Sequence, residues 1–143
     1  MHIPVKVDYG VRALIDLAQH EESSPIRSAD IARRQFVPEA FLDRLLLTMS
    51  KAGLVMSQRG PQGGHALALA PDQISLGAVM ESMGETETMV GCLDDPSVCN
   101  ISPACSQRDI WQEVEDAVRQ VLDKTTIADL VERLVDREPV QAG

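Results

Sequence analysis

The sequence predicts a mainly α-helical fold with a small α+β wing: a winged helix-turn-helix followed by a long C-terminal helix. Three observations support this prediction. An amphipathic helix over residues 38–53 runs directly into two short β-prone segments with a glycine-rich tip, two helices precede it, and a long amphipathic helix follows residue 105. The order helix, helix, tight turn, helix, wing is typical of DNA-binding modules.

The helix over residues 38–53 is defined by its two ends and its apolar face. Pro38 suits the first helical position, where its missing N–H is no loss, and Gly53 can close the helix in the left-handed conformation. The apolar residues at helical spacing are Leu42, Leu45, Leu46 and Met49. After the helix, residues 54–58 and 65–69 form the predicted hairpin, whose tip is too rich in glycine and proline for helix or strand.

A helix packed on a hairpin also occurs in small α+β domains that do not bind DNA, so the flanking helices decide between the two interpretations. We predict that double-stranded operator DNA is bound. Arg44 and Arg59 are expected to contact bases or phosphates, and the wing glycines to let the backbone approach phosphates. The residues expected at the DNA are Ser28, Glu39, Ala40, Phe41, Arg44, Lys51, Arg59, Gly60, Gln62, Gly63 and Gly64.

Two helices are expected upstream of the helix over residues 38–53, which we call the reading helix. Residues 5–19 place apolar side chains along one side over about four turns. Ser28 is expected to cap a second helix over residues 29–35, with Asp30 in its first turn. Arg33 and Arg34, at the end of that helix, either support DNA binding or form a solvated face.

Three more helices are expected after the wing. Ser75 is predicted to cap the first, and Thr126 with Asp129 to begin the last. Between them, Ser106 is predicted to begin a long helix with an approximate capping box. Its apolar stripe comprises Ile110, Trp111, Val114, Val118, Val121 and Leu122. A second copy of the chain is the expected cover for this stripe, since two-fold dimers are the commonest oligomers, and packing within one chain is the alternative.

Composition limits the class of protein. The chain has 143 residues, 44% of them hydrophobic, and no apolar run approaches the roughly 20 residues that span a bilayer. Charges among the first twenty residues exclude a signal-peptide core, so a cytoplasmic protein with no membrane partner is expected. The net charge is −9, yet residues 27–65 hold six Lys and Arg against three Asp and Glu. This basic segment permits attraction to phosphates.

All three cysteines, Cys92, Cys99 and Cys105, lie in one irregular segment. Their spacing lacks the C-x2-C pair of zinc ribbons, and thiols clustered in a polar loop are typical of metal or iron–sulfur ligands. Buried structural cysteines are the alternative. The candidates for a fourth ligand are His2, Asp8, His20, His65, Asp94, Asp95 and Asp109.

The wing segment from Arg59 to Gly64, the residues Asp8 to Leu14 near the start and the three cysteines together form a known pattern. Over roughly residues 1–136 the chain resembles the Rrf2 family of bacterial transcription regulators. The resemblance implies a homodimer whose winged helices read an operator, a long dimerisation helix, and in many members an iron–sulfur cluster in the cysteine loop. It also implies sensing of redox state, nitric oxide or iron through that cluster.

Carried over residue by residue, the resemblance implies that Cys92, Cys99 and Cys105 hold the cluster. In the cluster-assembly branch of the family a histidine stands three positions after the third cysteine, but this chain has Arg108 there, a cation that cannot ligate iron. The nitric-oxide-sensing branch uses an aspartate in the first helix of the partner subunit, and Asp8 matches it. Three cysteines with a carboxylate favour a 4Fe-4S over a 2Fe-2S cluster.

These expectations divide the chain into four segments: a winged helix-turn-helix over 1–84, a cluster-binding loop over 85–105, dimerisation helices over 106–136 and a flexible tail over 137–143. A regulator of the same fold could instead use its thiols as a redox switch or bind zinc, and a DNA-independent interaction module is a further alternative. An enzyme is disfavoured, because the sequence has no phosphate-binding glycine loop, nucleophile elbow or metalloprotease helix.

Overall fold

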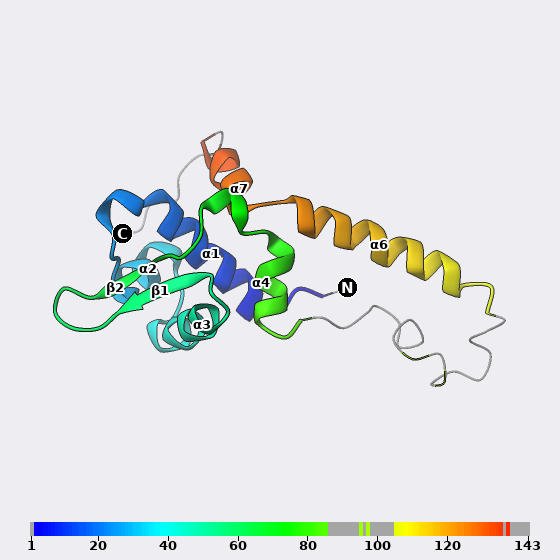
Figure 1. The fold of residues 1–143 in the computed structure, drawn as a ribbon, viewed down its shortest axis with the longest axis horizontal. Coiled ribbons are helices and arrows are strands. Elements are labelled where there is room, and N and C mark those ends of the chain that lie inside the picture. Colours follow the sequence, from blue (N-terminus) through cyan, green and yellow to red (C-terminus); the bar gives the residue numbers. More distant parts are fainter. Residues whose placement is uncertain (1, 86–94, 96, 98–104, 136, 138–143) are drawn as a thin grey trace.

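The computed structural model describes residues 2–85, 95, 97, 105–135 and 137. Within these ranges a helical body carries a two-stranded wing, and one long helix projects from the body (Figure 1). The helices are α1 (Val5–Gln19), α2 (Ser28–Gln35), α3 (Glu39–Lys51), α4 (Leu76–Ser82), α6 (Arg108–Lys124) and α7 (Ile127–Leu134). The strands are β1 (Val55–Gln58) and β2 (Gly64–Leu67), and 3-10 turns cover Glu21–Ser23 and Pro71–Gln73. The predicted winged fold with a C-terminal helix is confirmed.

α1 is the central element of the body, and α2, α3, α4 and α7 all pack against it. In Figure 1, α7 lies on one side of α1 and α3 on the other. The apolar face of α1 is buried at Leu14 and Leu17, and that of α3 at Leu42 and Leu46. Each buried leucine side chain contributes roughly 1.5–3 kcal/mol to folding. The helical periodicity of the sequence therefore builds the core that holds the reading helix.

The start of α2 differs from the sequence prediction. The helix begins at Ser28, and Arg27 precedes it with an extended backbone, φ −74° and ψ 143°. The carbonyl of Arg27 accepts from the amide of Asp30 at 3.1 Å. Ser28 already has a helical conformation, and an arginine side chain has no acceptor with which to cap. The prediction that Ser28 caps this helix was wrong by one position.

The start of α6 also differs. The helix begins at Arg108, and Gln107 before it has helical angles of φ −91° and ψ −23° with no side-chain cap. The side-chain oxygen of Gln107 instead accepts from the indole N–H of Trp111, 3.4 Å away. The capping box predicted at Ser106 was therefore wrong.

Three other predicted helix ends are confirmed. The hydroxyl of Ser75 accepts from the amide of Ala78, which caps α4. Thr126 and Asp129 form a reciprocal capping box at the start of α7, with bonds of 2.9 and 3.2 Å. Gly53, just beyond α3, has a φ of 83°, so the left-handed closure expected there is present.

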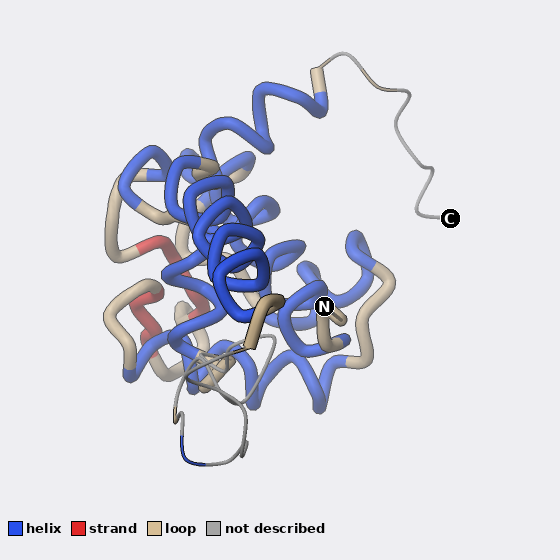
Figure 2. The backbone as a smooth tube through the Cα atoms, turned by 90° about the vertical axis from the view of Figure 1, so that its right-hand side faces the viewer, coloured by secondary structure: helices blue, strands red, loops and turns tan. Residues whose placement is uncertain are grey.

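The base of α6 is fastened to the body through backbone atoms. The amide of Leu76 donates to the carbonyl of Thr125 at 2.9 Å, and the amide of Ile127 donates to the carbonyl of Ile74 at 2.9 Å. Beyond this junction α6 packs on α4 and then extends away from the body, as Figure 1 shows, whereas Figure 2 views α6 nearly end-on. No described helix is both long and apolar enough to cross a bilayer.

Candidate nucleic-acid interface and metal centre

One side of α3 is exposed along its whole length. Its outward residues recur at helical spacing and are Glu39, Ala40, Asp43, Arg44, Leu47 and Lys51. Four of the predicted DNA contacts belong to this set. The opposite side of α3 is buried in the core. If α3 enters a DNA groove, these exposed side chains are therefore the ones that face the bases.

Phe41 occupies a different position from the other predicted α3 contacts. Its ring is half-buried and meets Tyr9 of α1 edge to face, with centroids 5.6 Å apart. The guanidinium of Arg44 lies over the ring of Phe41, 5.5 Å from the ring centroid. Stacking of this kind orients a guanidinium while leaving its donors available. Phe41 thus supports Arg44.

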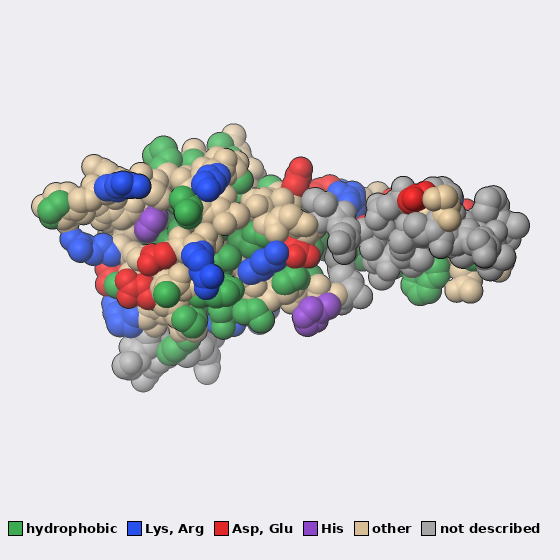
Figure 3. All heavy atoms as spheres, turned by 90° about the horizontal axis from the view of Figure 1, so that it is seen from below, with side chains coloured by type: hydrophobic (Ala, Val, Ile, Leu, Met, Phe, Trp, Pro, Cys, Tyr) green, Lys and Arg blue, Asp and Glu red, His purple; other side chains and the backbone are tan. Residues whose placement is uncertain are grey.

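The wing brings the second group of predicted contacts to the same end of the body. β1 and β2 pair antiparallel, with Gln58 opposite Gly64, and the tip between them is closed by a bond of 2.9 Å from the amide of Gly63 to the carbonyl of Gly60. Arg59 and Gln62 in this tip are exposed. Lys and Arg side chains lie over the half of the molecule that holds α2, α3 and the wing (Figure 3).

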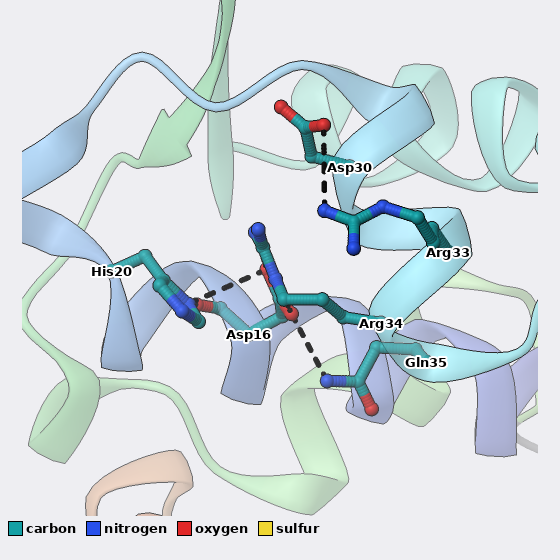
Figure 4. A network of polar contacts seen from close by, with 6 residues as sticks. All are labelled: Asp16, His20, Asp30, Arg33, Arg34 and Gln35. Atoms are coloured by element: carbon teal, nitrogen blue, oxygen red, sulfur yellow. Dashed lines mark hydrogen bonds and ion pairs between the residues drawn. The ribbon is translucent and has the colours of Figure 1, made fainter. Parts of the chain in front are cut away.

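A buried polar network fixes α2 to α1 (Figure 4). The carboxylate of Asp16 is fully buried and accepts two bonds from the guanidinium of Arg34, at 2.9 and 2.7 Å. Gln35 donates a third bond at 3.0 Å, and the ring of His20 donates to the carbonyl of Asp16 at 2.8 Å. The bond to Asp16 raises the pKa of Arg34, so this side chain remains a cation. Arg34 is therefore a structural residue, whereas Arg33 is exposed.

His65 lies inside the wing hairpin. It shares a hydrogen bond of 2.8 Å with the hydroxyl of Ser57 on the facing strand. Burial lowers the pKa of His65, and the nearby charge of Asp43 offsets part of that effect. The bond to Ser57 joins the two strands of the wing through their side chains, which is a structural role.

The predicted metal site lies largely outside the described residues, since Cys92, Cys99 and Asp94 are not among them. Cys105 is half-buried just before α6. Asp95 accepts two hydrogen bonds from Ser97, which lower the pKa of Asp95. In the described ranges no three His, Cys, Asp or Glu side chains converge on a common point.

Asp8 lies on the exposed side of α1, and its carboxylate accepts two bonds of 3.1 Å from Arg12. Arg12 also donates to the carbonyl of Gln35 at the end of α2 and stacks over Tyr9. Asp8 contributes to the rim of a hollow of about 580 Å³ between α1, α4, α6 and α7. The other lining residues are apolar: Ile3, Val7, Val11, Leu76, Met80, Leu122 and Leu130.

Three residues on or beside the candidate interface were not among the sequence predictions. Asp43 and Leu47 follow Glu39 at four-residue steps, so helical spacing alone could have identified them as members of the exposed face. Arg27 donates a hydrogen bond to the carbonyl of Pro61 in the wing tip. No sequence signal pointed to this last contact, because the two residues lie 34 positions apart.

The chain is similar in sequence and in fold to known transcriptional regulators. The Rrf2 family, described as iron-dependent transcriptional regulator, matches residues 3–133. The HTH-type transcriptional regulator IscR of Aliivibrio salmonicida is 31% identical over 148 residues, which cover 100% of this chain and 88% of that protein. The structure of T. potens IscR aligns with a TM-score of 0.77 at 30% identity, over 99% of this chain and 93% of that one. CymR, the global cysteine regulator of B. subtilis, aligns with a TM-score of 0.79 at 32% identity, over 93% and 98%.

Proposed function

Because this chain belongs to the Rrf2 family of DNA-binding transcriptional regulators, we propose that it is a homodimeric, cytoplasmic regulator that senses redox state, nitric oxide or iron. A cluster held by cysteines and by Asp8 of the partner subunit would be the sensing element. The observation that carries the DNA-binding part is the exposed polar side of α3 beside the wing, with Arg44 and Arg59 both outward. Arginine pairs bidentately with guanine or enters narrow minor grooves.

The dimer is supported by two apolar surfaces that one chain leaves uncovered. The stripe of α6 exposes 56% of Ile110, 37% of Trp111 and 63% of Val121. The hollow beside Asp8 is the second surface. In a two-fold dimer the α6 stripe of each copy can pack into the hollow of the other copy. Both apolar surfaces of both copies are then buried. This arrangement would bring Cys105 of one copy, just before α6, towards Asp8 of the other.

The α6 stripe gives a direct test of the dimer. We expect Ile110→Glu to weaken dimerisation at least about tenfold, since each of two symmetric interfaces would then bury an unpaired carboxylate. Sedimentation velocity over a dilution series measures this. Gln120→Glu, on the opposite side of α6, adds the same charge outside the stripe and should leave the dimer intact. An unchanged dimer in Ile110→Glu would move the interface away from α6.

The fit of a cluster to this chain depends on its donors. The thiol of Cys105 and the exposed carboxylate of Asp8 at the rim of the hollow are suitable iron ligands, and with Cys92 and Cys99 they would make three sulfurs and one oxygen. When bound, the cluster supplies a redox-sensitive set of bonds between the copies. Within this chain Asp8 is held by Arg12, so ligation requires Asp8 to share or exchange that partner.

Reconstitution under anaerobic conditions tests the cluster and Asp8 together. The wild type is expected to be brown, with visible charge-transfer absorption and iron and sulfide counts nearer four than two per subunit. Asp8→Ala should bind less iron and lose it faster in air. Asp72→Ala, an exposed acid on the 3-10 turn before α4, should match the wild type. If Asp8→Ala matches it too, Asp8 is not a ligand.

A second function is supported by the similarity to a structure described as a global cysteine regulator. Under this alternative the same winged dimer binds DNA, and its cysteines act as a thiol switch or hold zinc instead of iron. A colourless preparation that still binds promoter DNA would favour the alternative over the cluster.

A further inference from the structure

The segment just before α2 is joined to the wing. The amide of Ile26 donates to the carbonyl of His65 at 2.8 Å, and the amide of His65 donates back to the carbonyl of Ile26 at 2.7 Å. Through this antiparallel bridge, the backbone at Ile26 pairs with β2 as a short third segment beside the hairpin. Glycine at position 64 makes it possible, because a Cβ there would lie 2.6 Å from the carbonyl oxygen of Ile26. The base of the wing and the start of α2 therefore form one unit.

Arg27, the next residue, connects α2 to the wing tip as well. Its carbonyl begins α2 by accepting from the amide of Asp30, and its guanidinium donates to the carbonyl of Pro61. Pro61 lies within the turn that the bond between Gly63 and Gly60 closes. In the described part of the chain, this is the one side-chain hydrogen bond that reaches residues 59–63 from another element.

The wing tip has little else to hold it. Arg59, Gly60, Pro61 and Gln62 are exposed, so apolar packing contributes almost nothing to their position. A loop that must be ordered on binding costs affinity through the conformational entropy it loses, and fixing it beforehand removes part of that cost.

We infer that Arg27 is a positioning residue of the wing: it holds the tip against the start of α2 and so fixes where Arg59 meets the DNA. The inference rests on the proposed contact between the wing and DNA, and it adds a residue to which no DNA-binding role has been assigned. Arg27 is exposed, so direct contact with a phosphate is the competing role. The two roles differ in one measurable respect. A positioning residue acts through Arg59, whereas a phosphate contact acts independently of it.

A double-mutant cycle separates the two roles. The probe is a duplex that the wild-type protein selects from a random-sequence library, and its affinity is measured for wild type, Arg27→Ala, Arg59→Ala and the double variant. Arg27→Ala alone should weaken binding about fivefold, the effect of losing one ordinary hydrogen bond, because the guanidinium is exposed to water. In the Arg59→Ala background the same change should cost less than about twofold, because distant independent effects add and coupled ones do not.

Salt dependence provides a second readout. In the Arg59→Ala background, Arg27→Ala should leave the slope of log affinity against log salt unchanged. A full fivefold loss in that background, with a slope shallower by about one unit per phosphate contact, would overturn the inference and make Arg27 a phosphate ligand. Wild-type affinity in Arg27→Ala would overturn it as well. A silent Arg59→Ala would instead remove the wing contact itself, which is a separate failure of the proposed function.

Two controls exclude trivial causes. Arg133→Ala removes an exposed arginine from α7, on the far side of α1 from α3 (Figure 1), and should bind like the wild type. The thermal unfolding midpoint of Arg27→Ala should lie within about 3 °C of that of the wild type, as is usual for exposed polar contacts. Equal stability together with weaker binding distinguishes positioning from a general loss of fold.

Discussion

In a gel shift, Arg59→Ala is expected to leave operator DNA unbound at protein concentrations at which the wild type binds all of it. One arginine contact to a base is worth about 1–3 kcal/mol, and in the proposed two-fold dimer the loss would occur twice, so affinity should fall roughly a hundredfold or more. Arg59 is exposed in the wing tip and forms no bond within the described residues that the substitution would break. Stability should therefore remain that of the wild type.

The measurement should be made at two salt concentrations, because the share of affinity that comes from phosphates depends on ionic strength. Arg133→Ala again serves as the control for loss of one exposed cation. Unchanged retention by Arg59→Ala would remove the wing from the DNA interface and leave α3 as the reading element.

The second large effect is expected in folding. Asp16→Asn should lower the free energy of unfolding by about 3 kcal/mol, because it leaves Arg34 without its ionic partner beside a buried amide. This loss is at the low end for broken buried pairs, since the side chain of Arg34 is still 26% exposed to water. Urea denaturation at one fixed protein concentration measures the change, because the stability of the proposed dimer would depend on concentration.

Asp30→Asn is the matched control for Asp16→Asn. Asp30 faces Arg33 at 3.9 Å on the same helix, α2, but both side chains are at least half exposed. An exposed pair of this kind contributes about 0–1 kcal/mol, so the control should remain close to the wild type. If the two substitutions cost the same, the attachment of α2 to α1 depends on apolar packing and not on the Asp16 network.

The parts of the fold that follow from local pattern were predictable from the sequence. The apolar face of α3, the glycine-rich tip and the Thr126–Asp129 box are each encoded within a few residues, and the structure contains all three. The errors at Ser28 and Ser106 concern single positions, because a cap depends on backbone angles that residue type alone does not determine.

Interactions between distant residues were not predictable. Asp16 and Arg34 are 18 positions apart, and nothing in either neighbourhood marks them as partners. The same holds for Arg27 and Pro61. Phe41 was expected to face the groove because it lies next to Glu39 and Ala40, yet its ring turns towards Tyr9. The roles of Cys92 and Cys99 remain predictions, as both lie outside the described residues.

The backbone junction that ties Leu76 to Thr125 and Ile127 to Ile74 has an evolutionary consequence. Main-chain bonds survive most amino-acid replacements, so the outward side chains of α3 can be exchanged while α6 keeps the same angle to the winged body. In the proposed dimer, base preference can therefore change while the separation between the two halves of the operator stays nearly constant.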